Sequence, residues 1–175
     1  MHRQAPRIAP AAILAALALA SLAHAREEKI SIDQIPASVA ATVKQRFASA
    51  TVKGAAKETE HGKPVYEVTL DDAGRNVDAT LTPSGELVLI EKTISASELP
   101  APVSSALTKK YAGATYRTVE EIVEVTGASE KLTYYEVALV TAKKHSKEVR
   151  VTPDGAKVTE EDDEDEAEGE TGDDD

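Results

Sequence analysis

The sequence contains no cysteine and no tryptophan, and only one phenylalanine and five tyrosines. Without cysteine no disulfide can form, so the hydrophobic core alone must stabilise the fold. The same absence argues against a lipid-anchored lipoprotein, because no cysteine follows the apolar stretch near the N-terminus. The scarcity of aromatic side chains also leaves the chain few of the usual anchors of protein–protein interfaces.

The chain also lacks the excess of lysine and arginine that nucleic-acid binding requires. Its formal net charge is −11 at pH 7, and the acids are unevenly distributed. Residues 160–175 hold twelve acids and no base, and residues 1–25 hold two arginines and no acid, so residues 26–159 carry a net charge of only −1. We therefore expect no nucleic-acid partner for either part.

Catalytic and metal-binding signatures are missing as well. There is no Gly-x-Ser-x-Gly, phosphate loop or EF-hand spacing. After the first 25 residues the histidines are His61 and His145, which favours solvated turn residues over a zinc site. Asp71 and Asp72 are adjacent carboxylates, but a tight turn before Gly74 explains them better than acid–base chemistry. We predict no catalytic residue, no metal ligand, no cofactor and no enzymatic activity.

Residues 1–25 have the composition of a secretory signal peptide. Arg3 and Arg7 precede an apolar stretch from Ala11 to Ala20, and Ala23-His24-Ala25 is a small-x-small cleavage site. An uncleaved helical anchor is the alternative, but the stretch is short and rich in alanine. We expect a mature chain that begins near Arg26, has no integral membrane segment, and is periplasmic or secreted.

Two segments of the remaining chain resemble each other at a constant offset of 64 residues. "IPASVAATVKQRFASATVK" begins at Ile35 and "LPAPVSSALTKKYAGATYR" begins at Leu99. Apolar residues recur at every fourth position in both, which is typical of a helix with one buried stripe. Pro36 and Pro100 stand where a helix begins, a place at which the missing N–H costs nothing.

Similar strands follow each predicted helix. "VYEVTL" from Val65 matches "YYEVAL" from Tyr134, and both alternate apolar and polar residues, as a strand with one buried face does. Thr-Pro-x-Gly then occurs at Thr82 and again at Thr152, and proline followed by glycine is typical of a tight turn. The predicted strands are 51–60, 64–70, 75–81 and 86–94 in the first copy, and 115–126, 133–141, 146–151 and 156–159 in the second.

These patterns predict an α+β fold of two tandem repeats, each a helix packed on a four-stranded antiparallel sheet. The predicted organisation is a signal peptide (1–25), a first repeat (26–96), a second repeat (97–159) and an acidic tail (160–175). We interpret the tail as a disordered, solvating extension. Weak capture of Ca²⁺ or of a basic partner is the alternative, although no coordination loop is present.

The ordered set of features resembles the PepSY-like family, also described as β-lactamase-inhibitor-like. The set comprises a helix that opens x-Pro-x-x-Val and closes on an aromatic residue, Ala-Thr, Tyr-Glu-Val and a Pro-x-Gly turn, and it spans 35–94 and again 99–159. The resemblance implies exported bacterial proteins, often of tandem units, with a helix on a four-stranded antiparallel sheet. It also implies a non-enzymatic role in binding or inhibition.

The solvent face of the predicted sheet is the candidate site for a partner. Strand alternation places the following residues on it: Glu67, Asp78, Tyr134, Glu136, Glu148 and Arg150, with Thr80 beside them. An ordinary hydrated sheet face is the alternative interpretation. We predict an exported binding module, in one form an inhibitor of an envelope enzyme, that recognises an envelope protein or peptide on this face. A Ca²⁺-responsive envelope protein that acts through its tail is the second hypothesis.

Overall fold

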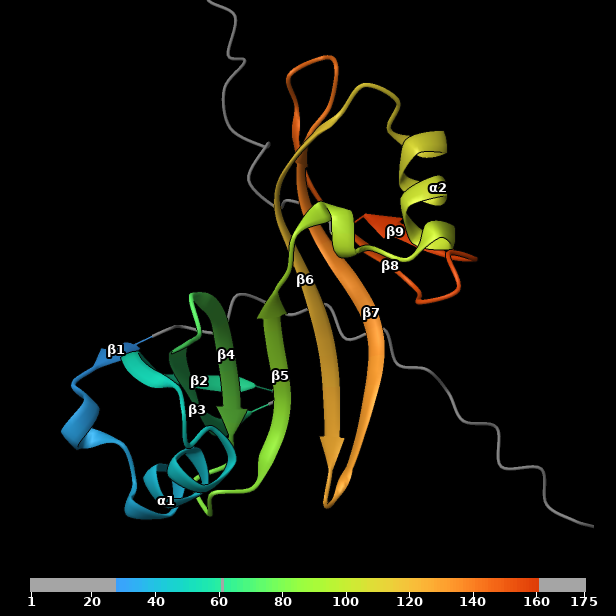
Figure 1. The fold of residues 1–175 in the computed structure, drawn as a ribbon. Helices are drawn as coiled ribbons and strands as arrows, with labels where there is room; N and C mark the ends of the chain where they lie inside the picture. Colours follow the sequence, from blue (N-terminus) through green and yellow to red (C-terminus); the bar gives the residue numbers. More distant parts are fainter. Residues whose placement is uncertain (1–27, 61, 161–175) are drawn as a thin grey trace, which may run out of the picture.

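The chain forms one antiparallel sheet in which every strand pairs with its neighbours in sequence (Figure 1). The computed structural model describes residues 28–60 and 62–160, so the predicted signal peptide, His61 and residues 161–175 of the predicted tail lie outside the described residues. The nine strands are β1 (Glu28–Ile30), β2 (Thr51–Glu60), β3 (Lys63–Asp72), β4 (Arg75–Leu81), β5 (Leu87–Thr93), β6 (Thr115–Thr126), β7 (Ser129–Val140), β8 (Ser146–Val151) and β9 (Val158–Glu160).

Two helices of equal length lie against the sheet, α1 (Ala37–Arg46) and α2 (Ala101–Lys110). Pro36 and Pro100 are their N-cap residues, both with φ of −56°, as the sequence predicts. Among residues 28–60 and 62–160, no helix has the length and the apolar composition needed to cross a membrane.

A short 3₁₀ turn precedes each helix: η1 (Ile32–Gln34) before α1 and η2 (Ala96–Glu98) before α2. The Ser31 N–H donates to Gln34 Oε1 at 2.8 Å, and the Ser95 N–H donates to Glu98 Oε2 at 2.8 Å. Both turns are therefore closed by the same reciprocal capping arrangement, 64 residues apart in sequence.

Both helices pack on the same face of the sheet. Strand β6 shows this, because Val119 belongs to the core beneath α2 and Val125 belongs to the core beneath α1. The two residues are six positions apart on a stretch of strand whose pairing with β5 is regular, so their side chains point to the same side. The opposite face carries no described helix, and we call it the open face.

Each helix buries two residues of a single stripe. Val39 and Val43 of α1 and Val103 and Leu107 of α2 are at most 4% exposed, as the four-residue periodicity predicts. The core beneath α1 contains Val68, Leu70, Val77, Ala79, Leu81, Leu87 and Val125. The core beneath α2 contains Ile94, Leu99, Tyr111, Val119, Tyr135, Val137, Leu139, Val149 and Val151. Hydrophobic burial in the two cores is the main stabilising term, since no disulfide is present.

The sheet is continuous between the two halves of the chain. Strands β5 and β6 are paired antiparallel from Leu89 opposite Glu124 to Thr93 opposite Glu120. The predicted α+β class and antiparallel pairing are confirmed, but the strands form one sheet of nine and not two separate sheets of four.

Most strands lie where the alternation predicts them, and the differences have local causes. The short edge strand β1 has no counterpart in the prediction, because three residues are too few to show a period. The β6–β7 hairpin was predicted to have a long loop up to Leu132, but β7 already begins at Ser129. The extra residues lengthen the two strands, and a β-bulge at Thr133 absorbs the change in phase.

The two Thr-Pro-x-Gly segments form matching turns. The Gly85 N–H donates to the Thr82 carbonyl at 2.8 Å, and the Gly155 N–H donates to the Thr152 carbonyl at 2.7 Å. Both glycines have positive φ, +86° and +70°, as the turn chemistry predicts. Each turn lies against the first turn of the helix of its own half.

Candidate functional site

The register of the strands places all six predicted residues on the open face. Glu67 is opposite Thr80, Asp78 is opposite Glu91, Glu136 is opposite Arg150, and Glu148 is opposite Ala138. Their sequence neighbours Val68, Ala79, Val137, Val149 and Tyr135 belong to the buried cores on the helix side. These side chains therefore share one face, and the structure groups them into two clusters.

Tyr134, Glu136 and Arg150 form the first cluster. Arg150 Nε donates to Glu136 Oε2 at 2.8 Å, and the Arg150 guanidinium carbon lies 4.7 Å from the centre of the Tyr134 ring. The side chains of Arg150 and Glu136 are only 18% and 14% exposed. A cation held by both a carboxylate and an aromatic face loses little further freedom on binding, so this group is preorganised.

Glu91 of β5 is the centre of the second cluster. It lies between Asp78 of β4 and Ile122 of β6 in the register, and it is half-buried. Burial raises the pKa of the Glu91 carboxyl to about 8, and the negative charges of Glu136, Glu120, Glu67 and Asp78 raise it further in that order. The carboxyl is therefore largely protonated at neutral pH.

Glu120 of β6 is part of the same acidic surface. It lies opposite Glu136 in the register and accepts a hydrogen bond from Thr93 Oγ1 at 3.2 Å. Burial raises its pKa, the Thr93 hydroxyl opposes this shift, and the nearby charges of Glu136 and Asp78 add to it. Five acids thus converge on the centre of the open face: Glu67, Asp78, Glu91, Glu120 and Glu136.

Sequence reasoning missed Glu91 and Glu120. Both lie on the strands that join the two halves, and the sequence did not reveal that β5 and β6 pair with each other. The alternation of Leu89, Glu91 and Thr93 along β5 is the signal that would have placed Glu91 on the open face once its neighbours were known.

The middle of the open face is not an ordinary hydrated surface. Ile122 is 0% exposed and Thr80 is 5% exposed, although no described helix covers either residue. The expected solvent exposure of Thr80 is therefore wrong, because β4 and its long neighbouring side chains enclose it. Water is excluded from part of this face, so charges there interact more strongly than at a convex surface.

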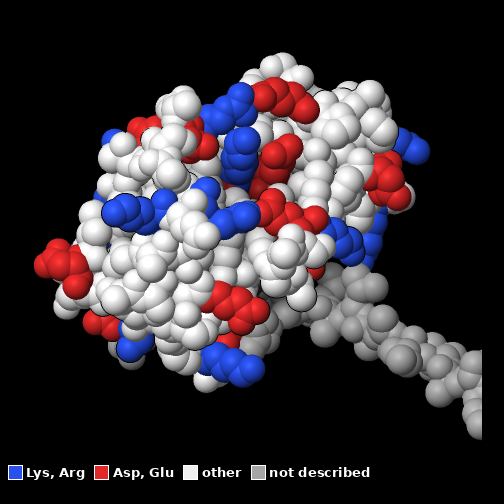
Figure 2. All heavy atoms as spheres, turned by 60° about the horizontal axis from the view of Figure 1, so that its bottom comes forward, with Lys and Arg blue, Asp and Glu red and all other residues white. Residues whose placement is uncertain are grey.

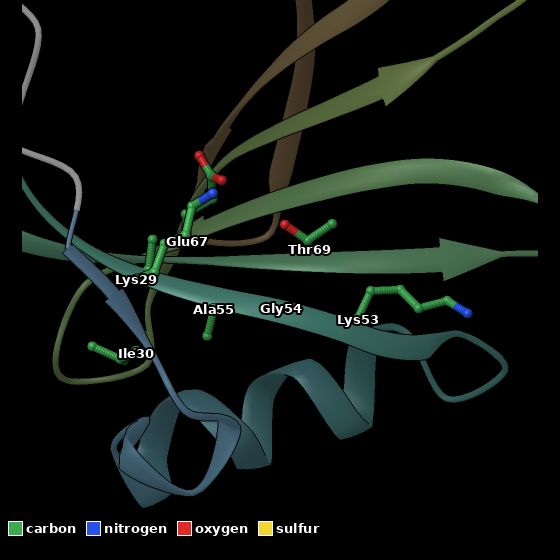
Figure 3. A pocket seen from close by; sticks show the side chains of 8 residues that line it. Lys29, Ile30, Lys53, Gly54, Ala55, Glu67 and Thr69 are labelled. Carbon is green, nitrogen blue, oxygen red and sulfur yellow. The ribbon is translucent and has the colours of Figure 1, made fainter.

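At the β1 edge the open face ends in a hollow of about 310 Å³ (Figure 3). Lys29, Lys53, Gly54, Ala56, Glu67 and Thr69 line it together with Ile30 and Ala55. Lys29 and Glu67 project on the same side of the sheet, whereas Ala55 points toward α1. Lys53 Nζ lies 3.4 Å from Asp71 Oδ2, so the hollow offers both ammonium and carboxylate groups.

The described surface carries charges of both signs. Figure 2 shows acidic and basic side chains interspersed, without a large region of one sign in that view. Within residues 28–60 and 62–160, no three His, Asp or Glu side chains come together in a way that suits a metal ion. His145 is exposed in the turn between β7 and β8. The cation-binding alternative falls on the acidic tail, of which the structure describes only Glu160.

Comparison with protein-family models finds no match to the sequence, and comparison with curated proteins finds none either. Solved structures with the same fold exist. A Bacteroides eggerthii protein that has been proposed to be periplasmic superposes with a TM-score of 0.57 at 17% identity, over 71% of this chain and 88% of that one. A DUF2874 family protein from Bacteroides ovatus gives 0.54 at 18% identity, over 71% of this chain and 86% of that one.

A BLIP-like protein from Bacteroides fragilis superposes with a TM-score of 0.52 at 17% identity, over 71% of this chain and 84% of that one. At such low identities the likeness concerns the fold. The chain therefore has the α+β architecture of these bacterial proteins, with one antiparallel sheet and two helices on the same face.

Proposed function

We propose that this chain is an exported binding protein without enzymatic activity, which holds a protein or peptide on the open face of its sheet. The observation that carries the proposal is the group formed by Tyr134, Glu136 and Arg150. An arginine fixed between a carboxylate and an aromatic ring resembles the anchors that dominate protein interfaces, which are enriched in Tyr and Arg.

The partner surface is expected to be basic where it meets the centre of the open face. Five acids converge there around Glu91, and Arg150 is already engaged by Glu136. A lysine or arginine of the partner placed beside Glu91 would favour the ionised carboxylate and remove the repulsion among its neighbours. Complementary charge of this kind speeds encounter and rejects acidic partners.

Inhibition of an envelope enzyme is one form that such binding takes. The BLIP-like name of one structural neighbour and the predicted resemblance to β-lactamase-inhibitor-like proteins both support it. The neighbours proposed to be periplasmic agree with the export that residues 1–25 predict. We further propose that the chain consists of two PepSY-like copies, supported by the paired capping turns and the paired glycine turns.

The test is capture of envelope proteins by the purified mature chain, compared between three forms. The double variant Tyr134→Ala, Glu136→Ala removes the arginine anchor. The control Lys44→Ala, Gln45→Ala changes two exposed residues of α1, far from the open face. We expect specific partners to be retained by the wild type and the control and lost by the open-face variant, with circular dichroism confirming that all three are folded.

Equal capture by the open-face variant and the wild type would contradict the proposal. Any partner that is an enzyme is then assayed with and without a stoichiometric excess of the chain. A fall in its activity that the control reproduces and the open-face variant does not would assign an inhibitory role.

A further inference from the structure

The edge of the sheet at β8 is only partly covered. Strand β9 pairs with β8 through three residues, from Val151 opposite Val158 to Val149 opposite Glu160. Strand β8 begins earlier, at Ser146, so within the described residues the stretch from Ser146 to Glu148 has no partner strand on this side. Uncovered strand edges invite pairing with other chains, and proteins usually protect them.

The chain leaves β9 through a residue that lysines already hold. Glu160 Oε2 accepts a hydrogen bond from Lys147 Nζ at 2.5 Å, and Glu160 Oε1 accepts one from the Tyr111 hydroxyl at 2.8 Å. Lys110 Nζ lies 3.4 Å from the same Oε1 atom and also donates to the Val158 carbonyl. The last described residue is thus tied to α2 and to β8 at once.

Further lysines surround this point. Lys109 and Lys110 form the last turn of α2, Lys143 and Lys144 form the turn between β7 and β8, and Lys147 lies on β8. These two regions are adjacent, because a Cβ on Gly113, just after α2, would lie 3.6 Å from Ala142 Cβ. Lys109, Lys143 and Lys144 are exposed and form no ion pair with a described residue. We call these five lysines the lysine edge.

The sequence that follows Glu160 is complementary to this surface. Residues 161–175 contain eleven acids and no base. If the register of β9 continues past Val149 opposite Glu160, residues 161, 162 and 163 come opposite Glu148, Lys147 and Ser146. Three residues of extended chain span roughly 10 Å, which is enough to cover the rest of the β8 edge.

We propose that the acidic C-terminal segment of the same chain occupies the lysine edge, extending β9 along β8 and pairing its carboxylates with these lysines. Such a contact closes the free strand edge and keeps it from joining a second copy. Because several exposed ion pairs share the contact, it weakens as the salt concentration rises. The site is independent of the open face, so it stands or falls separately from the proposed function.

Zero-length carbodiimide cross-linking of the full mature chain tests this directly, with the linked peptides read by mass spectrometry. We expect carboxylates of residues 161–175 to link to the lysine edge several-fold more than to Lys53, Lys57 and Lys63, which are exposed lysines of β2 and β3 in the other half. The excess is expected to disappear between about 0.01 M and about 1 M salt, over which the screening length falls from about 30 Å to about 3 Å.

An equimolar mixture of isotopically light and heavy chains separates links within one chain from links between two. Links of one isotope support the proposal, and mixed links in the proportion expected for exchange between chains would overturn it. Equal linking of the tail to the lysine edge and to the three control lysines at low salt would also overturn it. A variant with all eleven tail acids replaced by Asn or Gln provides a second readout: acylation of the lysine edge should accelerate, while that of the control lysines should not.

Discussion

Gly85 approaches Ser38 so closely that a side chain would not fit between them. A Cβ atom on Gly85 would lie 2.6 Å from the Ser38 carbonyl oxygen. The Ser38 hydroxyl donates to the Pro83 carbonyl at 2.7 Å, and the Thr42 hydroxyl donates to the Gly85 carbonyl at 2.7 Å. The turn between β4 and β5 is thereby docked on the first turns of α1, which explains why glycine is required there.

The variant Gly85→Ala is therefore expected to be strongly destabilised. The added methyl group meets backbone that cannot easily move, and alanine at φ of +86° is itself strained. We expect a loss of roughly 2–4 kcal/mol in the free energy of unfolding, measured by denaturant titration. Gly155→Ala should behave alike, because its Cβ would lie 2.4 Å from the Pro102 carbonyl oxygen.

Gly74→Ala is the matched control for this prediction. Gly74 has nearly the same φ, +85°, but a Cβ there would meet no atom within 4 Å. Only the backbone strain of about 1–2 kcal/mol should remain. If Gly74→Ala and Gly85→Ala destabilise equally, the close packing of turn on helix contributes nothing.

Removal of core volume in either half should affect the whole molecule. Leu70 lies in the core beneath α1 and Leu107 in the core beneath α2, and both are 0% exposed. Replacing either with alanine is expected to cost about 2–5 kcal/mol, from lost burial and the cavity left behind. Because β5 and β6 join the halves into one sheet, both variants should still unfold in a single transition, seen as coincident fluorescence and circular dichroism curves. Two separated transitions in either variant would mean that the halves unfold independently.

The sequence predicted the parts of the fold that depend on local periodicity. The stripe of Val39 and Val43 and the alternation around Val68 are set by residues close in sequence, and the structure confirms both. Whether the strands form one sheet or two depends on pairing between β5 and β6, which lie more than twenty residues apart. Their register follows from the packing of two helices on one face, and no local pattern encodes it.

The same limit applies to the candidate site. Parity along single strands was sufficient to place Glu136 and Arg150 on one face, and the structure brings them within hydrogen-bonding distance. It was not sufficient to find the cluster around Glu91, because that cluster exists only when five strands lie side by side. Burial of Thr80 likewise depends on neighbours from other strands.

The ion pair between Arg150 and Glu136 should be worth more than the exposed pairs of this molecule. The variant Arg150→Met leaves Glu136 half-buried beside Glu120 and near Glu91, with no cation to offset its charge. We expect a loss of roughly 1–3 kcal/mol in unfolding free energy at about pH 8. The double variant Arg150→Met, Glu136→Met should recover part of it, because the isolated carboxylate is removed as well.

Arg75→Met provides the comparison for the arginine variant. Arg75 pairs with Glu98 at 2.9 Å, but those side chains are 43% and 42% exposed. Water and salt screen such a pair, so the expected loss is only about 0–1 kcal/mol. A loss at Arg150 no larger than that at Arg75 would show that the open face is as well hydrated as the rest of the surface.

Stability of the protein should fall as the pH rises across the neutral range, because of Glu91. Its ordinary pKa of 4.5 applies to the unfolded chain, whereas in the folded state burial and the surrounding acids raise the pKa to about 8. Between these two values the folded state binds more protons than the unfolded state, so each increase in pH favours unfolding. The contribution is fully present below about pH 4.5 and is lost once the pH exceeds about 8.

The variant Glu91→Gln isolates this effect, since glutamine keeps the shape of the side chain and does not titrate. Unfolding free energies measured by urea titration from about pH 5 to about pH 9 should fall by up to a few kcal/mol more in the wild type than in Glu91→Gln. Glu86→Gln, at an exposed glutamate outside the acidic cluster, should follow the wild type. Parallel curves for the wild type and Glu91→Gln would mean that Glu91 is as well solvated in the folded protein as in the unfolded chain, and that water reaches the centre of the open face.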